Sequence, residues 1–157
     1  MKESMKWVLQ HFPDSDAEEV ICDTQKMIQA KSYNPPGDET RVAEFAAKRL
    51  REAGFDVEVD EFEKNRCNVI ATYGNKDDIA LILNGHMDVV PAFGEWEYPP
   101  DQGIRKDGIL HGRGSCDMLG GIAAILRAAS IIGREKITPK RGVMVLLVSD
   151  EEDVNRG

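Results

Sequence analysis

The stretch Gly142-Val143-Met144-Val145-Leu146-Leu147-Val148-Ser149-Asp150-Glu151-Glu152-Asp153 decides the fold class, because an apolar run ends there directly in acidic residues. A continuous run of this kind, rich in β-forming residues, predicts a strand that is buried on both faces. Binding and catalytic sites of open α/β sheets lie just outside the carboxyl ends of their strands. The acidic residues therefore stand where a site is expected, although a solvated acidic loop explains them equally well when they are taken alone.

A second segment, Leu83-Asn84-Gly85-His86-Met87-Asp88-Val89-Val90-Pro91, places a histidine and an aspartate two positions apart at the end of an apolar run. Residues i and i+2 of a strand point to the same face, so we expect the His86 imidazole and the Asp88 carboxylate to lie side by side. Such a pair suits a metal site, where the imidazole binds the cation and the carboxylate orients the imidazole. For this pair alone, a solvated turn is the alternative.

A third segment, Gly112-Arg113-Gly114-Ser115-Cys116-Asp117-Met118, leads into an apolar run that predicts a buried helix. Its glycines let the backbone pass close to a site, and Asp117 stands at the mouth of the helix. A helix N-cap is the alternative role for this aspartate. Nucleotide binding is not indicated, because a G-x-G-x-x-G pattern starting at Gly112 would need glycine at position 117.

The remaining segments alternate between helical and strand patterns. Ser15-Asp16-Ala17-Glu18 predicts a capping box for a helix that extends to about Lys31. Further helices are predicted at 39–53, with Gly54 as the stop, and at 120–132; strands are predicted at 56–62, 68–73, 79–83 and 142–149, and a hairpin at 104–110. This order predicts an α/β fold with helices layered around a mostly parallel mixed sheet.

Together, the segments resemble the N-terminal part of the dinuclear-zinc amidohydrolases, which include acetylornithine deacetylase, succinyl-diaminopimelate desuccinylase, aminoacylase and related carboxypeptidases and dipeptidases. The resemblance is carried by residues 84–91, 112–118 and 149–152, with lesser matches at 32–37 and 96–100. It covers the chain from the first predicted helix onward. It implies a zinc-exopeptidase-like catalytic domain.

The resemblance also implies a role for each matching residue. His86 would bind the first metal, and Asp88 would support catalysis by orienting the His86 imidazole. Asp117 would bridge two metals, Glu151 would be the general base, and Glu152 would bind the second metal. The expected cofactor is two Zn²⁺ ions per complete site, with Co²⁺ or Mn²⁺ as alternatives, and the peptide bond after Asp117 is expected to be cis.

The chain also departs from the family pattern. Leu119 stands where lysine is common, from which we expect a local change at the surface or in packing. By this resemblance, residues 1–157 are the N-terminal part of a truncated catalytic domain. The resemblance implies that the C-terminal part of that domain, with further metal ligands, and a small dimerisation or lid domain are absent from residues 1–157. The other histidines, His11 and His111, match no ligand position.

Composition narrows the choice of partners and compartment. The formal net charge of -8, with 28 acidic against 20 basic residues, argues against binding to nucleic acid or to an acidic membrane surface. The three cysteines lack paired spacing and are interpreted as reduced thiols. Because residues 1–6 show no signal peptide and no stretch reaches the length of a membrane span, we expect a cytoplasmic protein.

Three functional hypotheses follow. In the first, the protein is a metal-dependent hydrolase that cleaves an amide bond of an N-acyl amino acid or small peptide; the full-length protein is a homodimer, and the 157-residue chain is an incomplete, inactive portion. In the second, the chain is a non-catalytic metal-binding relative or fragment. In the third, the acidic cluster only increases solubility. A metal titration separates the third hypothesis from the others, and a hydrolysis assay separates the first two.

Overall fold

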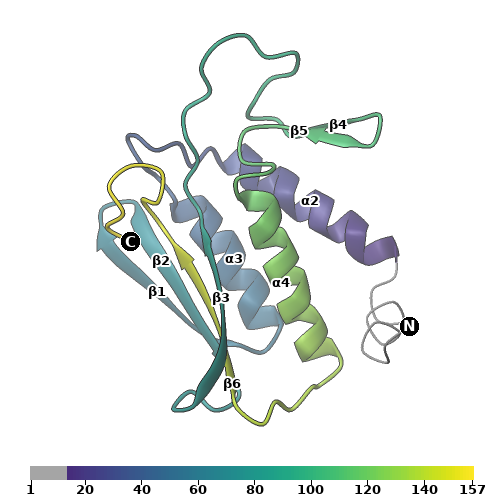
Figure 1. Cartoon of the computed structure of the whole chain (residues 1–157), viewed down its shortest axis with the longest axis vertical. Coiled ribbons are helices and arrows are strands. Elements are labelled where there is room, and N and C mark those ends of the chain that lie inside the picture. Colours follow the sequence, from purple (N-terminus) through teal and green to yellow (C-terminus); the bar gives the residue numbers. More distant parts are fainter. Residues whose placement is uncertain (1–13) are drawn as a thin grey trace.

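The computed structural model describes residues 14–157, so His11 lies outside the described part. The helices are α2 (Asp14–Ala30), α3 (Thr40–Glu52) and α4 (Leu119–Arg134). The strands are β1 (Asp56–Glu63), β2 (Arg66–Tyr73), β3 (Ile79–His86), β4 (Ile104–Lys106), β5 (Ile109–His111) and β6 (Gly142–Val148). Figure 1 shows one main sheet with the helices beside it. The α/β class and the β4–β5 hairpin are confirmed.

The main sheet is mixed, and its strand order is β1-β2-β6-β3. β3 and β6 run parallel, whereas β1 with β2 and β2 with β6 are antiparallel. The sheet is therefore mixed as predicted, but its described pairings are mostly antiparallel rather than mostly parallel. The short turn at residues 64–65 requires an antiparallel β1–β2 pair, while β3 and β6 are parallel because α4 provides the crossover between them.

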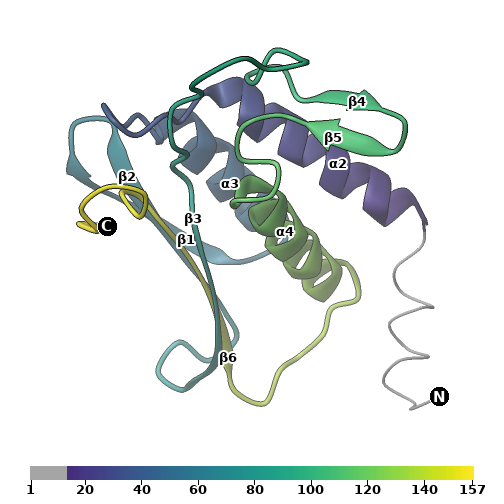
Figure 2. The same ribbon diagram turned by 45° about the horizontal axis from the view of Figure 1, so that its top comes forward.

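The helices cover one face of the sheet (Figures 1 and 2). α3 packs on β1 and β2 and α4 packs on β3, whereas α2 packs on the other two helices. Along β6, Val143, Val145 and Leu147 are buried, and the alternate residues between them are partly exposed. The prediction that this strand is buried on both faces is therefore wrong for the described part of the chain, where only the helical face is covered.

The core lies between the helices and the covered face. α3 contributes residues at helical spacing, namely Val42, Ala43, Ala46, Ala47 and Leu50. Gly54, at φ +85°, follows α3 in the left-handed conformation predicted for a helix stop. Leu119, where the sequence departs from the pattern of the resembled family, is fully buried in this core, so we interpret the departure as one of packing.

The element boundaries differ from the predictions in ways that affect the site. β3 extends to His86 because its pairing with β6 continues to His86–Val148, beyond the end of the apolar pattern. β2 begins at Arg66, two positions before the predicted start. α2 already includes Ser15, so the predicted capping residue lies inside the helix.

Two further expectations concern the cysteines and the helices. Cys22, Cys67 and Cys116 are free thiols, as the sequence predicted. Among residues 14–157, no helix combines the length and the apolar character that crossing a bilayer requires.

Candidate metal centre

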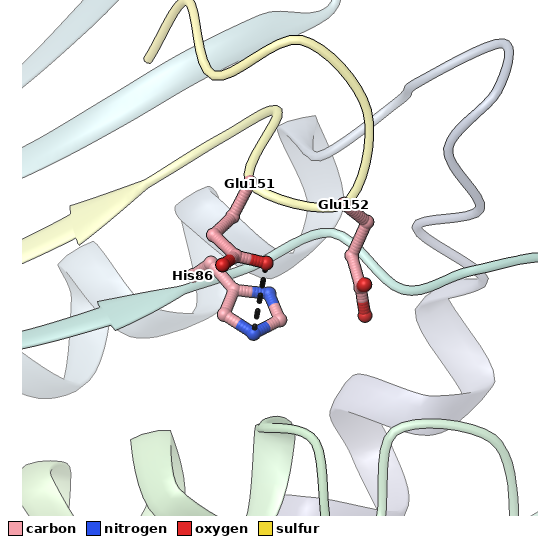
Figure 3. Close-up of side chains that lie close together, drawn as sticks. All are labelled: His86, Glu151 and Glu152. Atoms are coloured by element: carbon pink, nitrogen blue, oxygen red, sulfur yellow. Dashed lines mark ion pairs between the residues drawn. The ribbon is translucent and has the colours of Figure 1, made fainter.

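The site forms where two parallel strands end side by side. β3 ends at His86, which pairs with Val148 at the end of β6. The turn after β6 carries Glu151 and Glu152, and Figure 3 shows the Glu151 carboxylate next to the imidazole and the Glu152 side chain extending from the same turn to one side of the ring. The ligand atoms of these three residues all lie within 4.8 Å of one another. Parallel pairing therefore brings together two of the segments that the sequence singled out.

His86 is buried, and both of its ring nitrogens have oxygen neighbours. Nδ1 lies 3.0 Å from the Asp88 carbonyl oxygen and 3.6 Å from the Asp88 carboxylate. Nε2 lies 3.0 Å from Asp117 Oδ1 and 3.8 Å from Glu151 Oε2. Burial alone would lower the pKa of His86, but hydrogen bonds to Asp88 and Asp117 outweigh it and raise the pKa to about 9. In the absence of metal, the negative surroundings hold a proton here that a cation can replace.

Asp88 is fully buried and holds the turn that carries the glutamates. Its Oδ1 accepts a hydrogen bond from the Glu151 backbone N–H at 3.2 Å, and its Oδ2 accepts one from the Glu152 N–H at 3.0 Å. Burial would raise the pKa of Asp88, but hydrogen bonds with His86, Asn34 and the two N–H groups lower it to about 2. Asp88 thus lies beside His86 as the sequence predicted, and it also fixes a turn that no local pattern connected to it.

Asp117 reaches the site from the loop before α4. The N-cap of α4 is Met118 and no side chain caps this helix, so the alternative role of Asp117 as N-cap is wrong. Asp117 Oδ1 contacts His86 Nε2, but its side chain is 75% exposed, and it is not part of the group within 4.8 Å. The Asp117–Met118 peptide is cis, as the resemblance implied.

The two glutamates differ in their surroundings. Burial and the nearby charges of Asp117, Glu151 and Asp88 raise the pKa of Glu152, whereas Glu151 is half exposed. Crowded carboxylates around one imidazole nitrogen are stabilised by a cation. Imidazole nitrogen and carboxylate oxygen are ligands that Zn²⁺ accepts, so the donor set fits the expected metal.

Behind the centre lies a buried polar network that sequence reasoning missed. Asn34 Nδ2 donates to Asp88 Oδ2 at 2.8 Å and to Asp150 Oδ1 at 3.1 Å. Arg66 donates from Nη2 to Asp150 Oδ1 at 2.8 Å and from Nε to Glu39 Oε2 at 2.9 Å. Asn34 lies in residues 32–37, which match the resembled family. Nothing in the sequence around Arg66 indicated its role, because its partner Asp150 is 84 positions away.

Comparisons with known proteins identify the family to which the chain is similar. Residues 82–157 match the model of peptidase family M20/M25/M40. A curated succinyl-diaminopimelate desuccinylase from Xanthobacter autotrophicus is 39% identical over 133 residues, which are 82% of this chain and 34% of the relative. Another, from Wigglesworthia glossinidia brevipalpis, is 43% identical over 130 residues, which are 82% of this chain and 33% of the relative. The chain belongs to the M20/M25/M40 peptidase family.

Solved structures show the same fold. Human carnosine dipeptidase 1 matches with a TM-score of 0.81 and 20% identity, over 99% of this chain and 36% of the dipeptidase. An M20 family metallo-carboxypeptidase from Sulfolobus solfataricus matches with a TM-score of 0.68 and 20% identity, over 85% of this chain and 31% of the carboxypeptidase. At such identity the likeness concerns the fold alone. The chain spans about a third of the length of these curated relatives and solved structures.

Proposed function

We propose that this chain provides part of the active site of a metal-dependent hydrolase that cleaves an amide bond of an N-acyl amino acid or a small peptide. The observation that carries the proposal is the convergence of His86, Glu151 and Glu152 at the carboxyl edge of the sheet. The curated relatives are named as desuccinylases, which favours an N-acyl amino acid as substrate. A solved relative is named as a dipeptidase, which makes small peptides the second class to test.

His86, Asp117 and Glu152 would hold the metal, with Asp117 shared between two zinc ions. Co²⁺ or Mn²⁺ are alternatives, because they accept the same nitrogen and oxygen ligands. When bound, the metal supplies a Lewis acid that polarises the amide carbonyl and lowers the pKa of water. The buried Asp88 keeps the His86 ring in place, since Nδ1 faces the Asp88 backbone and carboxylate oxygens and Nε2 faces the centre.

Glu151 is the general base of the proposed reaction. Its side chain is half exposed, and its Oε2 lies 3.8 Å from His86 Nε2, so the carboxylate faces both the centre and the side open to solvent. From there it takes a proton from the attacking water and passes that proton to the nitrogen of the leaving amine. The Asp88 carboxylate accepts a hydrogen bond from the Glu151 backbone N–H at 3.2 Å. This bond holds the Glu151 backbone and so limits the positions that the Glu151 carboxylate can reach.

Metal binding is tested by calorimetric titration of the 157-residue chain with Zn²⁺ at pH 8. We expect weak binding that is lost in His86→Ala and in Glu152→Gln. His111→Ala is the matched control, because this ring packs against Tyr98 at 4.6 Å between centroids and is not in the cluster. An unaltered chain that binds no zinc would contradict the proposal, and so would binding that His86→Ala leaves unchanged.

Catalysis is tested with N-succinyl-diaminopimelate, N-acetyl amino acids and dipeptides. We propose that the product of the whole reading frame encoding this chain is a homodimer that hydrolyses one of these substrates. The 157-residue chain alone should bind metal without turnover, because one imidazole and two carboxylates, those of His86, Asp117 and Glu152, leave two cations under-coordinated. In the longer product, Glu151→Gln should keep metal binding and lower kcat by about 10²- to 10⁴-fold. Metal-dependent turnover by the 157-residue chain would contradict its proposed inactivity.

A further inference from the structure

Asp150 joins β6 to the turn that carries the glutamates. It is fully buried and has a φ of +70°, in the left-handed region that non-glycine residues rarely adopt. Such a conformation persists only where surrounding contacts hold it. Because Glu151 and Glu152 follow immediately, the conformation of Asp150 sets the direction in which both of them leave the strand.

Arg66 is placed to hold this residue. Its side chain is 4% exposed and lies at the start of β2, where Nη2 donates to Asp150 Oδ1 at 2.8 Å and Nε donates to Glu39 at 2.9 Å. Asn34 donates to the same Asp150 oxygen and to Asp88. Buried carboxylates need charged or hydrogen-bonding partners, because an unpaired buried charge is costly. Arg66 is the cation that faces Asp150 from the protein interior.

A second arginine contacts Asp150 from the outside. Arg156 donates from Nε to Asp150 Oδ2 at 2.9 Å, and its side chain is half exposed. It also pairs with Glu63 at 2.8 Å. Ion pairs exposed to water contribute less than buried ones that are fully hydrogen-bonded, so we expect Arg156 to contribute less than Arg66 to the conformation of Asp150.

We propose that Arg66 is a positioning residue, which holds Asp150 and thereby keeps the backbone N–H groups of Glu151 and Glu152 on the Asp88 carboxylate. Its relevance to metal binding rests on the proposed function; its effect on the turn does not. Within residues 14–157, Arg66 forms hydrogen bonds and ion pairs with Glu39 and Asp150 and none with the side chains of Glu151 and Glu152. Its influence on the centre therefore passes through Asp150.

A purely structural role is the alternative, and the chain offers a matched control for it. Arg127 on α4 is also buried, and it pairs with Asp16 and Glu19 on α2. Its partners are not residues of the candidate metal centre. Loss of either arginine should lower the melting temperature, since each removes a cationic partner of a buried carboxylate, Glu39 and Asp150 for Arg66 and Asp16 for Arg127. Only the loss of Arg66 should change the turn at Glu151 and Glu152.

The decisive experiment is amide hydrogen exchange of the metal-free protein, read at Glu151 and Glu152. We expect Arg66→Met to accelerate exchange at both amides by at least about tenfold relative to the unaltered protein. Arg127→Met should leave both rates unchanged after correction for global stability, and Arg156→Met should have the smaller effect. Equal exchange at both amides in Arg66→Met and Arg127→Met would overturn the proposal.

Two further variants keep the test valid if Arg66→Met does not fold. Glu39→Gln combined with Arg66→Met removes the buried charge of Glu39, which has no other cationic partner among the described residues, whereas Asp150 keeps Arg156. This double variant should fold with the same fast exchange at both amides. Arg66→Lys should restore part of the protection, because lysine keeps the charge but cannot donate in the geometry of the guanidinium. Full protection in the folded double variant would also overturn the proposal.

Zinc affinity provides a separate readout. Calorimetry with Zn²⁺ should show affinity reduced by about 10- to 100-fold in Arg66→Met and unchanged in Arg127→Met, as is typical when a group that supports metal ligands is lost. If the unaltered chain binds no zinc but the exchange difference is present, the positioning role stands and the proposed function fails. If zinc binds and the exchange difference is absent, the positioning role fails alone.

Discussion

The carboxylate of Asp88 accepts a hydrogen bond at 3.0 Å from the backbone N–H of Glu152, which lies 64 positions later in the chain. The same buried carboxylate lies 3.6 Å from Nδ1 of His86. One side chain therefore fixes the relative position of two segments that are expected to bind metal. A carboxylate in this place acts on both segments at once, so its replacement should affect the imidazole and the glutamate turn together.

The first prediction concerns this carboxylate. Asp88→Asn removes the negative charge beside His86, so the pKa of His86 should fall from its value of about 9. Zinc affinity should fall by about 10- to 100-fold, because the ligand loses the group that orients it. NMR titration of the imidazole and calorimetry measure the two effects. Asp101→Asn is the control, since Asp101 pairs with Lys31 away from the centre; an unchanged pKa of His86 in Asp88→Asn would contradict the prediction.

The second prediction concerns stability in alkaline solution. The pKa of His86 is raised from 6.5 to about 9, so the folded metal-free protein binds this proton more tightly than the unfolded chain does. The resulting stabilisation is complete below pH 6.5 and is lost as the pH rises through about 9. Urea unfolding at intervals from about pH 6 to 10 should therefore show a decline that is reduced in His86→Gln. If the free energy of unfolding declined equally with pH in the unaltered protein and in His86→Gln, the prediction would be wrong.

The third prediction follows from the same proton. Zinc must displace it from His86, so apparent zinc affinity should increase with pH up to about 9, by at most about tenfold per pH unit for this group. Calorimetry in buffers of different ionisation enthalpy measures the protons released on binding. A zinc affinity independent of pH between 6.5 and 9 would show that His86 is not a ligand.

The fourth prediction tests whether only one face of the main sheet is covered. Leu147→Ala should lower the free energy of unfolding by about 2–5 kcal/mol, because Leu147 is fully buried beneath the helices. Ile82→Ala should cost much less, since Ile82 is 55% exposed. Urea denaturation of both variants provides the comparison. Similar losses in the two variants would mean that the second face is covered in solution.

The fifth prediction concerns the loop that carries Asp117. A Cβ at Gly120 would lie 2.3 Å from the Ser115 carbonyl oxygen, so Gly120→Ala should displace the loop and weaken zinc binding. Gly121→Ala is the matched control, because a Cβ there meets only the flexible Met118 side chain, at 3.1 Å. Calorimetry and circular dichroism separate a weakened site from general unfolding. Equal zinc affinity in both variants would contradict the prediction that the close contact between Gly120 and the Ser115 carbonyl positions the Asp117 loop.

The sequence determined the identity of most elements and the segments from which the centre is built. Helical spacing in α3 and the apolar runs of β3 and β6 are local patterns. Burial of apolar side chains stabilises α3 and β6, whereas Leu81 and Ile82 of β3 are exposed in the described part of the chain. His86 and Asp88 could be paired from the sequence because strand geometry places residues i and i+2 on one face. The three segments at His86, Asp117 and Glu152 could be related to one another only through their resemblance to a family.

Tertiary structure alone decided the rest. Whether β6 is covered on one face or two depends on where the helices pack, which its own residues do not specify. The links from Arg66 to Asp150 and from Asp88 to Glu152 join residues far apart in the sequence, so no local period reports them. These buried polar groups are brought together by strand register and chain crossover. They remain there because, once water is excluded, each can be satisfied only by the others.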